Sequence, residues 1–132
     1  MTVLIDSWAW IEYWRGGAHS NQAAEFIEGS EMALASTINL TETFYWVLSH
    51  YGEKKAEEKR ETLKKRCFLI SVDEGIAVEA ARLKRSLKTS LADSLILATA
   101  RSREAKVLTG DPDFRQIPDA IFIGDLERRG KE

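Results

Sequence analysis

Short, continuous runs of hydrophobic residues recur along the chain, separated by longer stretches that mix polar and apolar positions. The runs cover residues 2–5, 32–35, 67–70, 106–109 and 120–123. Because they are continuous rather than alternating, they predict strands whose two faces are both covered. The short run at 32–35 is the weakest of the five.

Helical spacing of apolar residues fills the intervals and predicts helices around residues 23–27, 40–51, 76–87 and 92–99. Alternating strands and helices favour an α/β fold, a three-layer α/β/α sandwich with a mainly parallel, about five-stranded sheet. We find no repeat, low-complexity segment or linker, so we expect residues 1–132 to form a single domain. The tail after Asp125 could form a frayed helix.

Length and composition narrow the class of protein. The chain has 132 residues, 44% of them hydrophobic and 30% charged, as in ordinary globular proteins with one core. No apolar run approaches the roughly 18 residues of a membrane span, so no membrane partner is expected. The single cysteine, Cys67, cannot form an internal disulfide, which favours a cytoplasmic location.

Charge is distributed unevenly along the chain. The net charge is −2, which taken alone argues against a nucleic-acid partner. Up to Gly52, however, Arg15 is the one basic residue against six acids, whereas residues 54–66 contain seven basic residues and three acids. This basic segment is either a solvated helix face with i,i+4 ion pairs or a flank that contacts phosphates.

Carboxylates follow the predicted strands. Asp6 comes directly after the first run, and Asp111 lies just beyond the fourth. Glu42 and Asp93 lie near the starts of predicted helices, and the carboxyl edge of a parallel sheet could bring all four together. Clustered carboxylates repel one another unless a cation neutralises them, and oxygen ligands without His or Cys favour Mg²⁺ or Mn²⁺.

Each of these acids also has a purely structural interpretation. Asp6 could cap the helix that follows it, and Asp111 precedes a proline as an N-cap does. Asp93 has capping-box spacing behind Ser90, and Glu42 could be a first-turn acid behind an Asn39 cap. Capping does not require carboxylates at four matched positions, and capping and metal coordination are compatible.

The four segments that carry these acids resemble the PIN-domain family, most closely its small, single-domain VapC-type toxins of toxin–antitoxin pairs. They are residues 4–7 (LIDS), 39–45 (NLTETFY), 91–100 (LADSLILATA) and 108–114 (LTGDPDF). Their order and spacing span nearly the whole chain. Ser94 stands where the family often has alanine.

The resemblance implies a metal-dependent endoribonuclease that hydrolyses RNA phosphodiester bonds with carboxylate-bound Mg²⁺ or Mn²⁺. It also implies an RNA substrate, a homodimer and a cognate antitoxin protein as partners. Its catalytic and metal-binding residues would be an acidic quartet, supported by two hydroxyl residues and a further acid whose role stays open. The quartet is Asp6, Glu42, Asp93 and Asp111; the supporting residues are Ser7, Thr109 and Asp113.

Aromatic residues are concentrated before Gly52. Trp8, Trp10, Tyr13 and Trp14 occupy consecutive turns, so one helix cannot bury all of them against its own sheet. Aromatic side chains left at the surface would favour a protein interface.

Two other functions stay open. One is a catalytically silent PIN-like domain that acts as a protein-binding module. The other is a different Mg²⁺-dependent phosphoryl-transfer enzyme, of receiver or haloacid-dehalogenase type. The dehalogenase type needs a second Asp two residues after Asp6, where this chain has Trp8.

Overall fold

A five-stranded sheet forms the centre of the protein. The structure is a computed structural model, and it describes residues 1–125. All pairings are parallel, and the strand order is β3-β2-β1-β4-β5. The strands are β1 (Thr2–Ile5), β2 (Met32–Ser36), β3 (Phe68–Ile70), β4 (Lys106–Thr109) and β5 (Ala120–Phe122). The predicted parallel sheet is confirmed, including the weak run that becomes β2.

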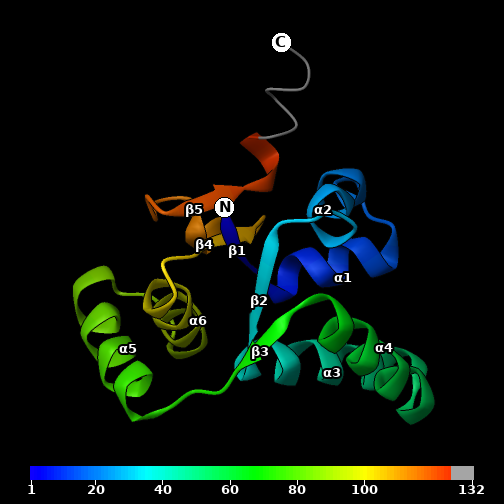
Figure 1. Cartoon of the computed structure of the whole chain (residues 1–132), viewed down its shortest axis with the longest axis horizontal. Coiled ribbons are helices and arrows are strands. Elements are labelled where there is room, and N and C mark those ends of the chain that lie inside the picture. Colours follow the sequence, from blue (N-terminus) through cyan, green and yellow to red (C-terminus); the bar gives the residue numbers. More distant parts are fainter. Residues whose placement is uncertain (126–132) are drawn as a thin grey trace.

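Helices cover both faces of this sheet, so the predicted three-layer α/β/α fold is confirmed (Figure 1). In Figure 1 the first four helices lie on one side and the last two on the other. They are α1 (Ser7–Arg15), α2 (Ser20–Ile27), α3 (Thr37–Tyr51), α4 (Glu53–Arg66), α5 (Glu74–Leu87) and α6 (Leu91–Ser102); a short 3₁₀ helix, η1 (Pro112–Phe114), follows β4. The tail predicted to fray lies outside the described residues.

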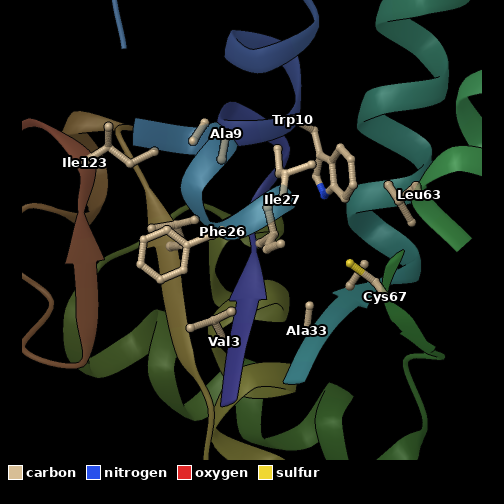
Figure 2. Close-up of a cluster of buried hydrophobic side chains, with 13 residues drawn as sticks. Val3, Ala9, Trp10, Phe26, Ile27, Ala33, Leu63, Cys67 and Ile123 are labelled. Carbon is tan, nitrogen blue, oxygen red and sulfur yellow. The ribbon is translucent and has the colours of Figure 1, made fainter. Parts of the chain in front are cut away.

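Alternation within the strands divides the core into two clusters. Val3 and Ile5 of β1 face a cluster that contains Trp10, Phe26 and Leu63 from the helices on that side (Figure 2). Leu4, between them, faces a second cluster built from α5, α6 and η1. Both faces of the central strands are buried, and this explains why their apolar runs are continuous.

The outer strands depart from the predicted burial. Phe68 in β3 is 64% exposed, and all three residues of β5 are only partly buried. Both strands are sheet edges, where a neighbour is missing on one side. β3 also begins one residue later than predicted, because Cys67 ends α4 as its C-cap. Burial raises the pKa of the Cys67 thiol to about 12, as expected for a small buried hydrophobe rather than a reactive thiol.

Of the four aromatic residues of α1, one is fully buried and three are partly buried. Trp10 is fully buried, and Trp8, Tyr13 and Trp14 pack against the same cluster. As expected, α1 does not bury all four of these aromatics fully, and part of the cover they have comes from α2 and α3, against which the helix also packs. Apart from Phe68 in β3, the exposed large aromatics among residues 1–125, Tyr45 and Tyr51, belong to α3.

No helix among the described residues is both long and apolar enough to cross a membrane.

Candidate active site

Asp6 lies between the end of β1 and the start of α1, at the carboxyl edge of the sheet. Its side chain is almost fully buried. Oδ2 accepts a 2.7 Å hydrogen bond from Thr109 Oγ1, and Oδ1 accepts a 3.2 Å bond from Asn39 Nδ2. Asp6 is the N-cap residue of α1, but its side chain makes no cap hydrogen bond, so the structural interpretation of this carboxylate is wrong. Side chains from β4 and α3 hold its oxygens instead.

Glu42 approaches the same edge from the second turn of α3. Ser7 donates a 2.6 Å hydrogen bond from its Oγ to Glu42 Oε1. The same Ser7 oxygen accepts a 2.9 Å bond from Asn39 Nδ2. Asn39 therefore links Asp6, Ser7 and, through Ser7, Glu42 into one buried hydrogen-bonded group.

Asp93 and Asp111 approach from the other side of the site. Asp93 is half-buried in the first turn of α6, and its backbone N–H donates to Ser90 Oγ at 3.1 Å. Asp111 follows β4; its N–H donates to Thr109 Oγ1 at 3.0 Å, and its Oδ1 caps η1 by accepting from the Asp113 N–H at 2.9 Å. Capping by Asp111 is thus real, and it leaves the second carboxylate oxygen available.

Asp113 joins these two residues. Asp93, Asp111 and Asp113 each place a carboxylate oxygen within 4.8 Å of the others, close enough to share a cation. We call these three residues the outer trio, and Asp6 with Glu42 the inner pair. Asp6 and Glu42 are not part of that tight group. The structure thus places Asp113 close to Asp93 and Asp111, and the inner pair outside this group.

The pKa values show that the two groups interact. The pKa of Asp6 is raised to about 7, mainly by burial; the hydrogen bond from Thr109 opposes this rise, and the charges of Glu42 and Asp93 contribute to it. The pKa of Asp93 is raised to about 6, first by burial and then by the charge of Asp111, with smaller contributions from Asp113 and Glu42 and an opposing hydrogen bond from Ser90. Both carboxyl groups are therefore hard to ionise without a compensating cation.

Gly110 is required between Thr109 and Asp111. A Cβ at this position would lie 2.5 Å from the ring of Trp8, far inside van der Waals contact. The indole thus packs directly against the backbone that carries both site residues, which gives Trp8 a positioning role that the sequence did not reveal.

Asn39 is the other residue that sequence reasoning misassigned. It is not the N-cap of α3. Ser36 is the N-cap, and Asn39 Oδ1 accepts a 2.9 Å hydrogen bond from the Ser36 N–H, which completes a capping box. Its distance of three residues from Glu42 places both on one helix face, and that spacing is the signal that could have identified it.

Comparisons with known proteins agree with this geometry. A profile of the PIN domain matches residues 3–120. The chain belongs to the PIN-domain family. The comparison with curated protein sequences gives no match.

Solved structures of toxin–antitoxin proteins share the PIN fold found here. A toxin–antitoxin complex from Klebsiella pneumoniae is 24% identical, with a TM-score of 0.77 over 92% of this chain and 97% of that one. VapC20 from Mycobacterium tuberculosis, a sarcin-ricin loop cleaving toxin, is 18% identical, with a TM-score of 0.75 over 89% and 96%. VapBC-1 from nontypeable Haemophilus influenzae is 18% identical, with a TM-score of 0.73 over 92% and 96%.

The donors of this PIN domain suit a hard divalent cation. The outer trio offers oxygen ligands alone, and in addition to burial the charges of Asp111 and Asp113 raise the pKa of Asp93. Mg²⁺ and Mn²⁺ prefer such ligands, whereas zinc sites usually include His or Cys. The residues therefore fit the expected ion.

Proposed function

We propose that this PIN domain is a metal-dependent endoribonuclease that hydrolyses RNA phosphodiester bonds. The observation that carries the proposal is the convergence of the outer trio beside the buried, hard-to-ionise Asp6. Carboxylates packed in this way destabilise the fold unless a cation neutralises them. Membership of the PIN family supports a nuclease reaction at this site. Asp6, Glu42, Asp93 and Asp111 are the proposed catalytic residues.

Asp93 and Asp111, with Asp113, would hold Mg²⁺ or Mn²⁺, and Asp6 and Glu42 would contribute from the inner side. When bound, the ion supplies an activated water and neutralises charge that develops on the phosphate during in-line attack. We expect a 5′-phosphate and a 3′-hydroxyl as products.

The protein's own side chains orient this machinery. Thr109 fixes Asp6 Oδ2 and also accepts from the Asp111 N–H, so one hydroxyl aligns two carboxylates from different strands. Asn39 fixes Asp6 Oδ1, and Ser7 fixes Glu42 Oε1. Such supporting hydrogen bonds typically change metal affinity or activity about 10- to 100-fold.

The proposed biological role is that of a VapC-type toxin, paired with an antitoxin in a reducing cytoplasm. It is supported by the structural likeness to toxin–antitoxin complexes and by exposed aromatics on α3. Trp46 stacks on His50 with ring centroids 4.5 Å apart, and Tyr51 packs edge-on to Trp46. Trp46 and Tyr51 border a cavity of about 170 Å³ that a partner helix could enter. We also propose a homodimer, which light scattering would detect.

Total RNA incubated with the protein and either Mg²⁺ or Mn²⁺ tests the proposal. Wild type should produce discrete cleavage sites that vanish in excess EDTA and return with the metal. Asp6→Asn should remove them, whereas Asp73→Asn, which retains the α5 cap, should cut as wild type does. Cleavage that survives EDTA would overturn the mechanism. A folded protein that binds Mn²⁺ and cuts no RNA would favour the silent protein-binding module.

A further inference from the structure

A second cavity opens beside the outer trio. It has a volume of about 550 Å³ and is bordered by residues 86–90, in the turn between α5 and α6, and by Asp113, Gln116 and Ile117 around η1. Ligand sites span roughly 300–1,000 Å³, so this cavity has room for one nucleotide. We call it the α5–α6 cavity.

The α5–α6 cavity shares parts with the proposed active site. Asp113 belongs both to the cavity wall and to the outer trio. Ser90 also lines the cavity, and its Oγ accepts from the N–H of Asp93. A polymer whose phosphate lies at the trio would therefore place an adjacent unit in the cavity.

Hydrogen bonds fix the wall of the α5–α6 cavity. Thr89 Oγ1 lies 2.6 Å from the Oγ of buried Ser94, which itself donates to the Ser90 carbonyl at 2.7 Å. Lys84 Nζ donates to the Thr89 carbonyl at 3.1 Å. Ser94 stands where the family often has alanine, and an alanine could make neither of these two hydrogen bonds to the turn.

The lining suits a nucleotide rather than a purely apolar ligand. Lys88 offers a cation for a phosphate, and the Gln116 amide can donate to and accept from a base edge. Leu87 and Ile117 supply apolar surface for the face of a base. Arg85 adds positive charge in the same last turn of α5.

We propose that the α5–α6 cavity binds the nucleotide next to the scissile phosphate in single-stranded RNA and thereby selects the cleavage site. The proposal rests on the proposed ribonuclease function. Unpaired RNA bases are read by hydrogen bonds to their edges and by contacts with their faces, and this cavity offers both.

Two substitutions remove the proposed contacts. Lys88 has a left-handed backbone with φ 59°, so Lys88→Asn removes the charge with a residue that tolerates this conformation. Gln116→Ala removes the amide. The control is Lys106→Asn, the same charge change at the exposed amino end of β4, on the opposite edge of the sheet from the carboxyl edge.

Cleavage kinetics on a short RNA that contains one mapped site should separate the variants. We expect Lys88→Asn to raise KM about 10-fold with kcat within twofold, equal to about 1.4 kcal/mol of binding. Gln116→Ala and Ser94→Ala should shift cleavage among sites in total RNA. Lys106→Asn should leave both KM and the cleavage pattern unchanged.

Photocrosslinking provides a measurement that does not need cleavage. RNA containing 4-thiouridine, bound to the Asp6→Asn variant, should crosslink to the peptides that contain residues 86–90 or 113–117, and Lys88→Asn should weaken that crosslink. The outcomes separate the two proposals. Crosslinks there without any cleavage by wild type would support the cavity and overturn the ribonuclease proposal.

If wild type cleaves RNA, and KM, cleavage pattern and crosslinks are all unchanged in Lys88→Asn, Gln116→Ala and Ser94→Ala, the cavity proposal alone is overturned. An RNA that is neither cut nor crosslinked would overturn both, as would crosslinks elsewhere combined with no cleavage.

Discussion

The inner pair and the outer trio differ in how the protein holds their carboxylates. Asp6 receives hydrogen bonds on both oxygens, and Glu42 receives one from Ser7. Within the trio, Asp111 Oδ1 accepts from the Asp113 N–H, and a hydrogen bond from Ser90 lowers the pKa of Asp93 without overcoming the effect of burial. Protein donors therefore organise the inner side, whereas the outer side brings like charges together and leaves their neutralisation to a ligand.

This difference assigns the two groups different tasks. A carboxylate whose oxygens are already hydrogen-bonded is fixed in direction before any ligand arrives, so it can orient a reactant. Carboxylates that repel one another gain free energy when a cation neutralises them, so a stronger repulsion gives a higher cation affinity. We expect the inner pair to control geometry and the outer trio to control cation affinity.

The largest expected effect follows from removing a charge from the trio. Asp93→Asn should lower RNA cleavage by more than about 100-fold, the upper end for residues that only orient a metal ligand. Cleavage is measured at saturating Mn²⁺, with Asp73→Asn as the matched control. Activity within tenfold of wild type would show that Asp93 does not coordinate the ion.

Stabilisation by the cation should depend on the outer trio. At 100 times its dissociation constant, Mn²⁺ should stabilise wild type by about 2.7 kcal/mol against urea unfolding. Asp93→Asn should lose most of this stabilisation, because it removes both a ligand and part of the repulsion. An equal gain in wild type and variant would place the ion elsewhere.

Asn39 tests the inner side. Asn39→Asp keeps an acceptor for the Ser36 N–H but removes the donor that faces Asp6 and Ser7. We expect cleavage to fall about 10- to 100-fold. The control on the same helix is Thr41→Ala, whose exposed hydroxyl bonds only the Thr37 carbonyl. If the Asp variant folds and cuts as wild type does, Asn39 has no positioning role.

The fold was predictable because its signal is local and repeated. Runs of apolar residues separated by helical stretches lead to a parallel sheet covered on both faces, and β1 shows why the runs must be continuous. Burial of α1 was not predictable in the same way. Trp14 is covered partly by Lys59 from α4, whose Nζ lies 5.5 Å from the ring centroid, and that contact depends on helix packing rather than on local spacing.

Of the candidate site, the sequence predicts which residues gather but not how each is held. Strand ends bring Asp6 and Asp111 to one edge in any parallel sheet. The η1 turn places the Asp113 carboxylate beside Asp111, and only the three-dimensional path of that turn decides this. The sequence near Asn39 suggests only a helix cap. Its hydrogen bond to Asp6 joins positions 33 residues apart, so local spacing could not reveal it.

The smallest effect concerns the pH dependence of the metal-free protein. Asp93 has a pKa of about 6 in the folded chain against an ordinary value of 3.8, so the folded state binds more protons between these values. The resulting stability is fully present below pH 4 and is lost as pH rises through 6. Because the group is half-exposed, solvent screening limits the change to about 1 kcal/mol.

Urea unfolding in EDTA from pH 4 to pH 7 measures this loss. As pH rises, wild type should lose about 1 kcal/mol of unfolding free energy relative to Asp93→Asn, which lacks the titrating carboxyl group. Asp73→Asn should show the same pH dependence as wild type. A flat difference would mean that the trio's repulsion is relieved by water or relaxation, and that the outer carboxylates are less dependent on a cation than their 4.8 Å spacing indicates.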